Sequence, residues 1–122
     1  MILADTSIWI DHLRAGDLQL GQLLNQGQVV IHPMVIGELA LGSFKERSQA
    51  LALLDLLPQV PVARLSEVRH MIEARRLHGR GIGLVDAHLI ASVLIDSSSR
   101  LWTRDKNLRK VAGDIGIHVG LV

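Results

Sequence analysis

The segment at residues 2–14, ILADTSIWIDHLR, predicts a short strand that leads directly into a helix. The apolar run that opens it has the length of a buried strand and ends at Asp5. Thr6 or Ser7 can cap a helix that runs to about Arg14. The same order, a strand followed by a helix, recurs along the chain and is typical of an α/β fold.

The rest of the chain repeats this alternation of short apolar runs and helical segments. The expected strands are residues 2–4, 29–31, 60–63, 101–103 and 117–119. The expected helices after the first are residues 18–24, 33–41, 48–57, 66–79, 84–95 and 106–112. Because the strand candidates are apolar without alternation, both of their faces should be buried. The sequence therefore predicts a three-layer α/β/α domain around a short, mostly parallel central sheet of about five strands.

Length and composition restrict the class of protein. The 122 residues fit one domain, residues 1–122. The absence of cysteine excludes a disulfide scaffold and a Cys-ligated zinc site. No apolar run reaches the roughly 18 residues of a membrane span, and the first residues lack a basic leader, so we expect a cytoplasmic protein without a membrane partner. Residues 62–122 carry 10 basic and 6 acidic side chains, which suits either a polyanionic partner or a solvated helix face.

Four carboxylates lie in apolar surroundings. Asp5 and Asp105 each follow a predicted strand. Glu38 and Asp86 share helical stripes with apolar residues, so both should point inward. Because ligands of an open α/β sheet bind outside the carboxyl ends of its strands, we expect the acids to converge at that rim.

Such a cluster of acids needs compensation. Burying an unpaired carboxylate costs several kcal/mol, and four together would repel one another. A divalent cation relieves the repulsion, and oxygen ligands favour Mg²⁺, with Mn²⁺ as a possible substitute, over zinc. Each acid alone also has a structural interpretation, as a helix N-cap, an ion-pair partner or a favourable charge at a helix N-terminus.

Four segments place these acids and their polar neighbours in a defined order. They are ILADTSIWIDHLR at 2–14, HPMVIGELALGSF at 32–44, GRGIGLVDAHLIAS at 79–92 and LWTRDKNL at 101–108. With these segments the chain resembles the PIN-domain ribonucleases, and most closely the VapC toxins of bacterial type II toxin–antitoxin systems. Each motif is weak alone, but the four together, in order and correctly spaced, cover essentially the whole chain. Leu84 is a departure, because relatives often carry an aromatic residue there.

The resemblance implies both a site and an activity. The implied metal site consists of Asp5, Glu38, Asp86 and Asp105, with Asp5 and Asp86 as the most direct ligands. The polar neighbours expected to support it are Thr6, Ser7 and Thr103. The implied activity is that of a magnesium-dependent endoribonuclease toxin, which hydrolyses structured RNA such as tRNA and so inhibits translation and growth. The resemblance also favours a homodimer and a cognate VapB-like antitoxin that covers the first helices.

Basic residues near the acids are candidates for contacts with RNA phosphates. They are Arg80, Arg104, Lys106, Arg109 and Lys110, with Arg75 and Arg76 leading into the loop at 79–83. For any one of them a solvated helix face is an equally good interpretation. With only three aromatic residues, selectivity should come from RNA shape rather than from stacked bases. The six histidines lack metal-ligand spacing and are expected to be structural or surface residues, with His88 also a candidate for RNA contact.

Two other functions are compatible with a chain of this length and fold class. A receiver domain has a similar length and class, but it needs adjacent acids after its first strand, an acid after its third and a late lysine, and this chain lacks them. A non-catalytic RNA-binding or assembly module on the same fold is the alternative. The complete set of four acids argues against it, because a module without chemistry has no need for costly carboxylates.

Overall fold

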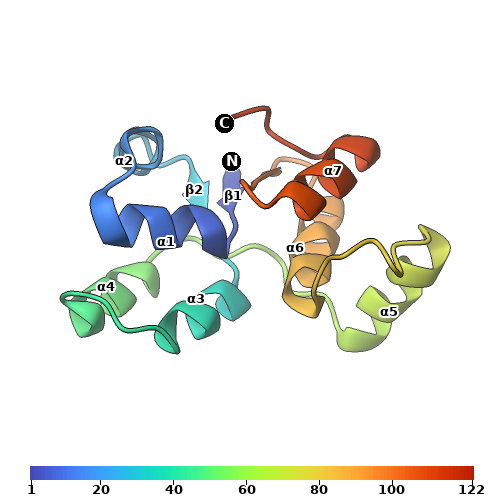
Figure 1. Cartoon of the computed structure of the whole chain (residues 1–122), viewed down its shortest axis with the longest axis horizontal. Coiled ribbons are helices and arrows are strands. Elements are labelled where there is room, and N and C mark those ends of the chain that lie inside the picture. The colour runs from blue at the N-terminus through green and yellow to red at the C-terminus, as the bar shows by residue number, and fades with distance from the viewer.

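The structure is a computed structural model that describes residues 1–122. A parallel sheet lies between two groups of helices, with α1 to α4 on one side and α5 to α7 on the other (Figure 1). The strands are β1 (Ile2–Ala4), β2 (Val29–Val30) and β3 (Arg100–Trp102). The helices are α1 (Thr6–Ala15), α2 (Leu18–Asn25), α3 (Pro33–Ala40), α4 (Arg47–Leu54), α5 (Leu65–Ala74), α6 (Leu84–Ile95) and α7 (Lys106–Ile115). The predicted α/β class is confirmed.

The sheet has the order β2-β1-β3, and both pairs are parallel. Leu3 of the central strand lies opposite Val30 on one side and Leu101 on the other. Its side chain is fully buried. Because the strands run in one direction, their carboxyl ends meet at a single rim, where the chain passes into α1, α3 and α7.

Of the two outer strands that the sequence predicted, 117–119 is reduced to a single bridge, and 60–63 is replaced by a single bridge at the residue before it. Ile31 pairs with Gln59, and Leu101 pairs with His118, both in parallel orientation. At the first of these edges, Pro58 and Pro61 have no N–H to donate, so the pairing cannot extend. The five predicted strands therefore appear as three strands and two bridges.

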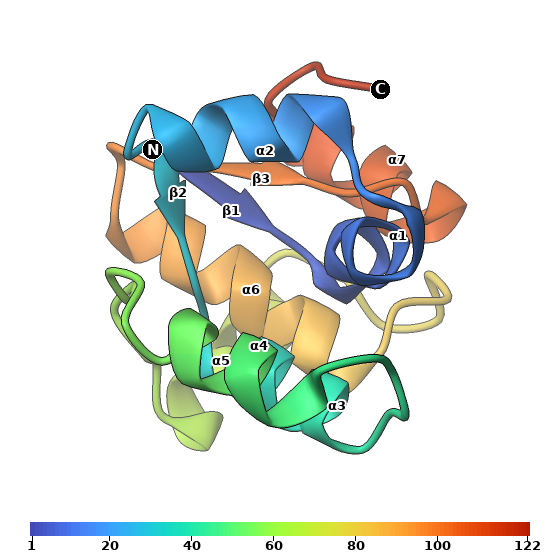
Figure 2. The same ribbon diagram turned by 90° about the vertical axis from the view of Figure 1, so that its left-hand side faces the viewer.

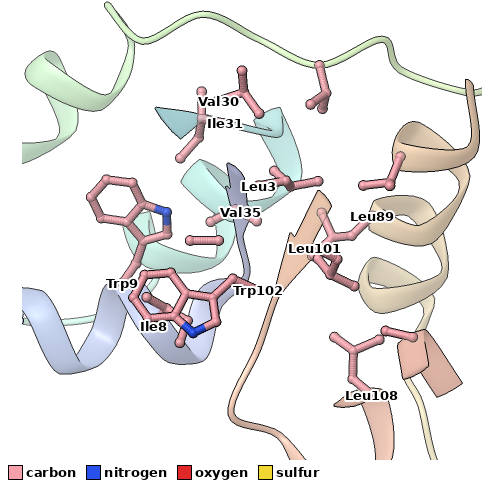
Figure 3. Close-up of a cluster of buried hydrophobic side chains, with 14 of the residues drawn as sticks. Leu3, Ile8, Trp9, Val30, Ile31, Val35, Leu89, Leu101, Trp102 and Leu108 are labelled. Atoms are coloured by element: carbon pink, nitrogen blue, oxygen red, sulfur yellow. The ribbon is translucent and has the colours of Figure 1, made fainter. Parts of the chain in front are cut away.

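The core fills the space between the sheet and the helices. A cluster of 22 buried residues contains Leu3, Ile8, Trp9, Leu101 and Trp102 among others (Figure 3). In Figure 2, α2 crosses one end of the sheet while α6 lies across the other side of it. This packing anchors the start of α1 and the start of α6, which carry Asp5 and Asp86.

The bounds of α6 match the prediction, and its residues 87–93 are all buried. It packs against α5, with Ala63, Val68 and Ala91 in a second small cluster. At 12 residues it is the longest helix, and none of the helices has the length and apolarity to cross a membrane. Helix α5 is shorter than predicted because the chain turns at Arg76, whose φ is 54°. The N–H of Leu77 then donates to the carbonyl of Ile72, and the buried Leu77 side chain closes the turn.

Candidate functional site

Asp5 lies at the end of β1 and is the N-cap of α1. Its Oδ1 accepts hydrogen bonds from the Ile8 N–H at 3.2 Å and from Ser7 Oγ at 2.5 Å, and its Oδ2 accepts one from Thr103 Oγ1. The side chain is buried, and this burial raises the pKa of the carboxyl although the hydrogen bonds oppose the shift. Two of the three predicted polar neighbours, Ser7 and Thr103, therefore contact this acid directly.

Glu38 lies on α3 and reaches back to the first residue of α1. Its Oε1 accepts a hydrogen bond from Thr6 Oγ1 at 2.6 Å, so the third predicted polar neighbour also contacts an acid. The prediction that Glu38 points into apolar surroundings is wrong, because the residue is exposed. Helix α3 buries only Val35 and Leu39, and Glu38 lies on its open flank.

Asp86 occupies the first turn of α6 and is half-buried. Its Oδ2 accepts a hydrogen bond from the N–H of Gly83 at 3.0 Å. Burial raises the pKa of this carboxyl, and the negative charges of Asp5, Asp105 and Glu38 raise it further. The repulsion from all three shows that the sequence-distant acids share one region of the molecule.

Asp105 begins α7 as its N-cap, and its Oδ2 accepts from the N–H of Leu108 at 2.9 Å. Its own N–H donates to Thr103 Oγ1 at 3.0 Å, the same hydroxyl that donates to Asp5. Thr103 is therefore a direct link between two of the four acids. Asp105 is exposed. Solvent exposure therefore increases across the four acids, from the buried Asp5 to Asp105 and Glu38 at the open edge.

None of the four acids has a basic partner. The ion pairs of the chain use Asp11, Asp17 and Asp114 instead. Neighbouring carboxylates that are partly buried and lack a cation are unfavourable unless a cation or a proton compensates them. An all-oxygen donor set with excess negative charge suits a hard divalent ion such as Mg²⁺ or Mn²⁺.

The carboxylates face local donors rather than a common point. No three acidic or histidine side chains lie close enough to hold one metal ion together in this arrangement. Asp5 uses three of its roughly four acceptor positions within the fold and keeps about one for a further ligand. An ion at this rim would therefore be held directly by a few of these oxygens and through water by the others.

Two of the predicted RNA contacts, Arg104 and Arg80, form ion pairs with acidic residues of the same chain. Arg104 pairs with Asp11 at 2.8 Å and Asp17 at 2.5 Å, and its guanidinium lies 5.2 Å from the ring centroid of Trp102. Arg80 pairs with Asp114 of α7 at 2.6 Å. For both arginines this arrangement favours a structural role.

The other three predicted contacts share one surface of α7. Lys106, Arg109 and Lys110 line an open hollow of about 580 Å³, with Asn107 between them in the sequence. All three basic residues are exposed. Asn107 was not singled out by the sequence, yet its Nδ2 donates to the carbonyl of Gly81 at 3.2 Å and ties the loop before α6 to α7.

Comparison with known proteins is consistent with this arrangement. The family model for the PIN domain matches residues 2–114. The chain is 50% identical over 117 residues to Ribonuclease VapC32 of Mycobacterium tuberculosis strain CDC 1551 / Oshkosh, which is 96% of this chain and 94% of that protein. Ribonuclease VapC32 of strain ATCC 25618 / H37Rv matches with the same identity and coverage.

Proposed function

Since the chain belongs to the PIN-domain family, among the VapC ribonucleases, we propose that it is a magnesium-dependent endoribonuclease and the toxin of a type II toxin–antitoxin system. The observation that carries the proposal is Asp86, a half-buried carboxylate that three other acids repel and that no basic side chain compensates. Asp5 and Asp86 would hold the ion most directly, with Glu38 and Asp105 acting directly or through water. Mn²⁺ would substitute for Mg²⁺.

The proposed chemistry is hydrolysis of an RNA phosphodiester. A bound divalent ion supplies positive charge for the phosphate oxygens and makes a water more acidic near neutral pH. Asp5 is held by Ser7 and Thr103, so its carboxylate keeps one orientation. The exposed Glu38 and Asp105 can accept a proton from an attacking water at the open edge of the site. We expect products with a 5′-phosphate and a 3′-hydroxyl.

The exposed Lys106, Arg109 and Lys110 are the proposed phosphate contacts, because they line one hollow on the helix that begins at Asp105. A structured RNA such as tRNA is the proposed substrate, and its cleavage would inhibit translation in the cytoplasm. Replacing one of these residues should reduce the slope of log RNA affinity against log salt concentration by about one, because about one fewer counterion is released on binding.

A substitution at Asp86 tests the proposal. The purified chain and its Asp86→Asn variant are incubated with tRNA and Mg²⁺, and the cleaved ends are mapped. The change should reduce cleavage about 10²- to 10⁴-fold, because a metal site contributes several kcal/mol to the transition state. Asp55→Asn, at an exposed acid away from the site, is the control. Cleavage that persists in EDTA, or products with 2′,3′-cyclic phosphates, would contradict the proposal, and intact binding without any cleavage by the wild type would favour the non-catalytic module.

An antitoxin partner is proposed for the apolar surface beside Glu38. One hollow of about 200 Å³ is lined by Ile10, Leu13, Leu39 and Phe44 together with Glu38. A second, of about 160 Å³, lies between α1 and α4 and includes Leu53, which is 67% exposed. An apolar segment seated here would bring a basic side chain within reach of the acids.

Leu53→Lys should abolish co-purification with the product of a small neighbouring gene, because it places a charge in the second hollow. Leu65→Lys changes an exposed leucine of α5, on the other side of the sheet, and should leave the complex intact. A homodimer is also proposed, and light scattering should give twice the 13.4 kDa mass of one chain.

A further inference from the structure

A pocket opens beside Asp86, between α5 and the start of α6. It has a volume of about 220 Å³. The residues that line it are Ile72, Leu77, His78, Gly79, Ile82, Gly83, Leu84 and Ala87. Gly83 belongs to the wall of this pocket, and its N–H donates to Asp86 Oδ2 at 3.0 Å. The pocket and the acidic site therefore share a wall.

The loop that forms this wall is held in place by α7. Arg80 pairs with Asp114 at 2.6 Å, and Asn107 Nδ2 donates to the Gly81 carbonyl at 3.2 Å. At Gly81 a Cβ would lie 2.5 Å from Asn107 Nδ2, and the φ of 78° also disfavours other residues. These contacts fix the loop at 79–83, so the pocket exists before a ligand arrives.

The pocket combines apolar walls with one aromatic ring. Its side chains are aliphatic apart from the imidazole of His78, which is exposed. Arg75 and Arg76 immediately precede the lining residues in the chain, and both are exposed. Neither arginine belongs to an ion pair of the chain.

The backbone of Arg76, just before the lining residue Leu77, is strained. The residue adopts a φ of 54°, a conformation in which glycine would be less strained. It thereby ends α5 and directs Leu77 and His78 towards the pocket. A cationic side chain therefore occupies a backbone position that favours glycine.

We propose that this pocket receives one nucleobase of the substrate RNA, from the nucleotide next to the bond cleaved at the acidic site. This inference rests on the proposed ribonuclease function and adds a base-specific element to it. An unstacked base has apolar faces that fit aliphatic walls and stack on a histidine ring, while the phosphate of its nucleotide suits the exposed Arg75 and Arg76 just before Leu77 in the chain. An apolar pocket that shares a wall with the acidic site and contains a histidine ring fits this occupant better than an acyl chain or an apolar peptide. His78 is then the residue that determines base specificity. The sequence predicts only structural or surface roles for the six histidines, with His88 as the candidate for RNA contact, and the structure buries His88.

Binding of mononucleotides tests the pocket without cleavage. AMP, GMP, CMP, UMP and ribose 5-phosphate are titrated separately into the full chain, and the backbone amides of residues 77–84 are followed by NMR. At least one nucleotide should bind ten times more tightly than ribose 5-phosphate. His78→Ala should weaken that nucleotide at least fivefold, as expected for the loss of a stacked base. His70→Ala, at an exposed histidine of α5 outside the pocket, should bind as the wild type does.

Three results would overturn the proposal. Equal binding of ribose 5-phosphate and the nucleotides would mean that only phosphate is recognised. Unchanged nucleotide binding by His78→Ala would remove the stacking residue. Amide shifts at 77–84 that follow protein concentration without ligand would place a second copy of the chain in the pocket.

A second measurement connects the pocket to cleavage. The ends of digested total RNA are sequenced for the wild type, His78→Ala and His70→Ala. The wild type and His70→Ala should share a base preference beside the cut, and His78→Ala should lose it. Nucleotide binding at the pocket without any cleavage would refute the ribonuclease function alone, whereas cleavage with an unchanged preference in His78→Ala would refute the pocket alone.

Discussion

The Nη2 atom of Arg104 lies 2.5 Å from Oδ2 of Asp17, so the residue before Asp105 is bound to the loop between α1 and α2. The same guanidinium reaches Asp11 on α1 and, through Nε, the carbonyl of Val122 at 3.3 Å. Desolvation opposes the shift, but the hydrogen bond from the N–H of Leu20, together with the hydrogen bond and charge of Arg104, holds the pKa of Asp17 below its usual value. One side chain thus joins the start of α7 to α1 and to the last residue of the chain.

Removing this link should cost stability without loss of RNA affinity. Arg104→Ala should lower the free energy of unfolding by about 1 to 2 kcal/mol, because two charge-assisted pairs of partly exposed groups are lost. Combined with Asp17→Asn, the two changes should be non-additive by about 1 kcal/mol in urea denaturation. If Arg104 instead contacts phosphate, its replacement would weaken RNA binding and reduce the salt dependence while leaving the double-mutant cycle additive.

The charge of Asp86 should lower the stability of the metal-free chain. Asp86→Asn removes a charge that burial and three neighbouring acids disfavour, and asparagine can still accept the hydrogen bond from Gly83. We expect the apo variant to be more stable than the wild type by about 1 kcal/mol at pH 7. Asp55→Asn, at an exposed acid, should change stability by less than about 0.5 kcal/mol in the same denaturant series.

Divalent ions should stabilise the folded chain. At a free Mg²⁺ concentration of 100 times Kd, linkage predicts a gain of about 2.7 kcal/mol, or a rise in Tm of about 10 °C. Scanning calorimetry with Mg²⁺, Mn²⁺ and EDTA measures this directly. Asp55→Asn should keep the rise and Asp86→Asn should lose most of it, and a Tm that is independent of the ion would contradict the metal site.

Histidine 32 should make the fold sensitive to mild acid. The ring of His32 is fully buried, its Nδ1 accepts from the N–H of Met34, and burial together with the nearby His88 lowers its pKa to about 4. The unfolded chain, with a histidine pKa near 6.5, binds this proton at higher pH than the folded chain does. The stability should therefore be complete above about pH 6.5 and fall as the pH decreases towards 4, by up to about 3 kcal/mol.

The comparison of His32→Asn with His70→Asn checks this window. Asparagine at 32 can still cap α3, so the variant should fold and show a flatter stability profile between pH 4 and 6.5. His70→Asn changes an exposed histidine and should keep the slope of the wild type. Identical slopes for the three proteins would assign the acid sensitivity to other groups.

The left-handed backbone at Arg76 should separate stability from RNA binding. Arg76→Gly relieves a φ of 54° and should stabilise the chain by up to about 1 kcal/mol, while the loss of the cation weakens RNA binding. Glu46 has a φ of 55°, so Glu46→Gly is a matched control for the backbone effect. It should give a similar gain in stability with no loss of RNA affinity. Equal RNA affinities for the two variants would show that the Arg76 charge has no role in binding.

Elements of the fold were predicted most accurately from the sequence where a single physical cause, such as burial on all sides, determines the local structure. The bounds of α6 were correct because a segment that is apolar all round and follows Gly83 can only be a buried helix. The three short strands were found because they are buried on both faces. The pairing of the polar residues Thr6, Ser7 and Thr103 with acids was anticipated only through family resemblance.

Other features depend on packing that local patterns do not contain. Glu38 was expected to be buried, but the direction of its helix face was set by α1, which lies against α3. Arg104 was a candidate phosphate contact because it neighbours Asp105, while its actual partner Asp17 is 87 residues away in the chain. The pocket beside Asp86 is formed jointly by α5, a loop and α6, so no single segment of the sequence predicts it.

The hydrogen bonds of Asp5 within the fold affect the order in which related chains can lose the proposed site residues. The carboxylate caps α1 by accepting from the N–H of Ile8 and joins β1 to Thr103, so a neutral replacement should damage the fold together with the proposed metal site. Glu38 is exposed and has only the hydroxyl of Thr6 as a partner, so its replacement leaves the fold intact. In relatives that are no longer selected for RNA cleavage, Glu38 and Asp86 should be replaced before Asp5. The presence of Asp5 alone is therefore weak evidence that a relative is active, whereas the presence of Glu38 and Asp86 is stronger evidence.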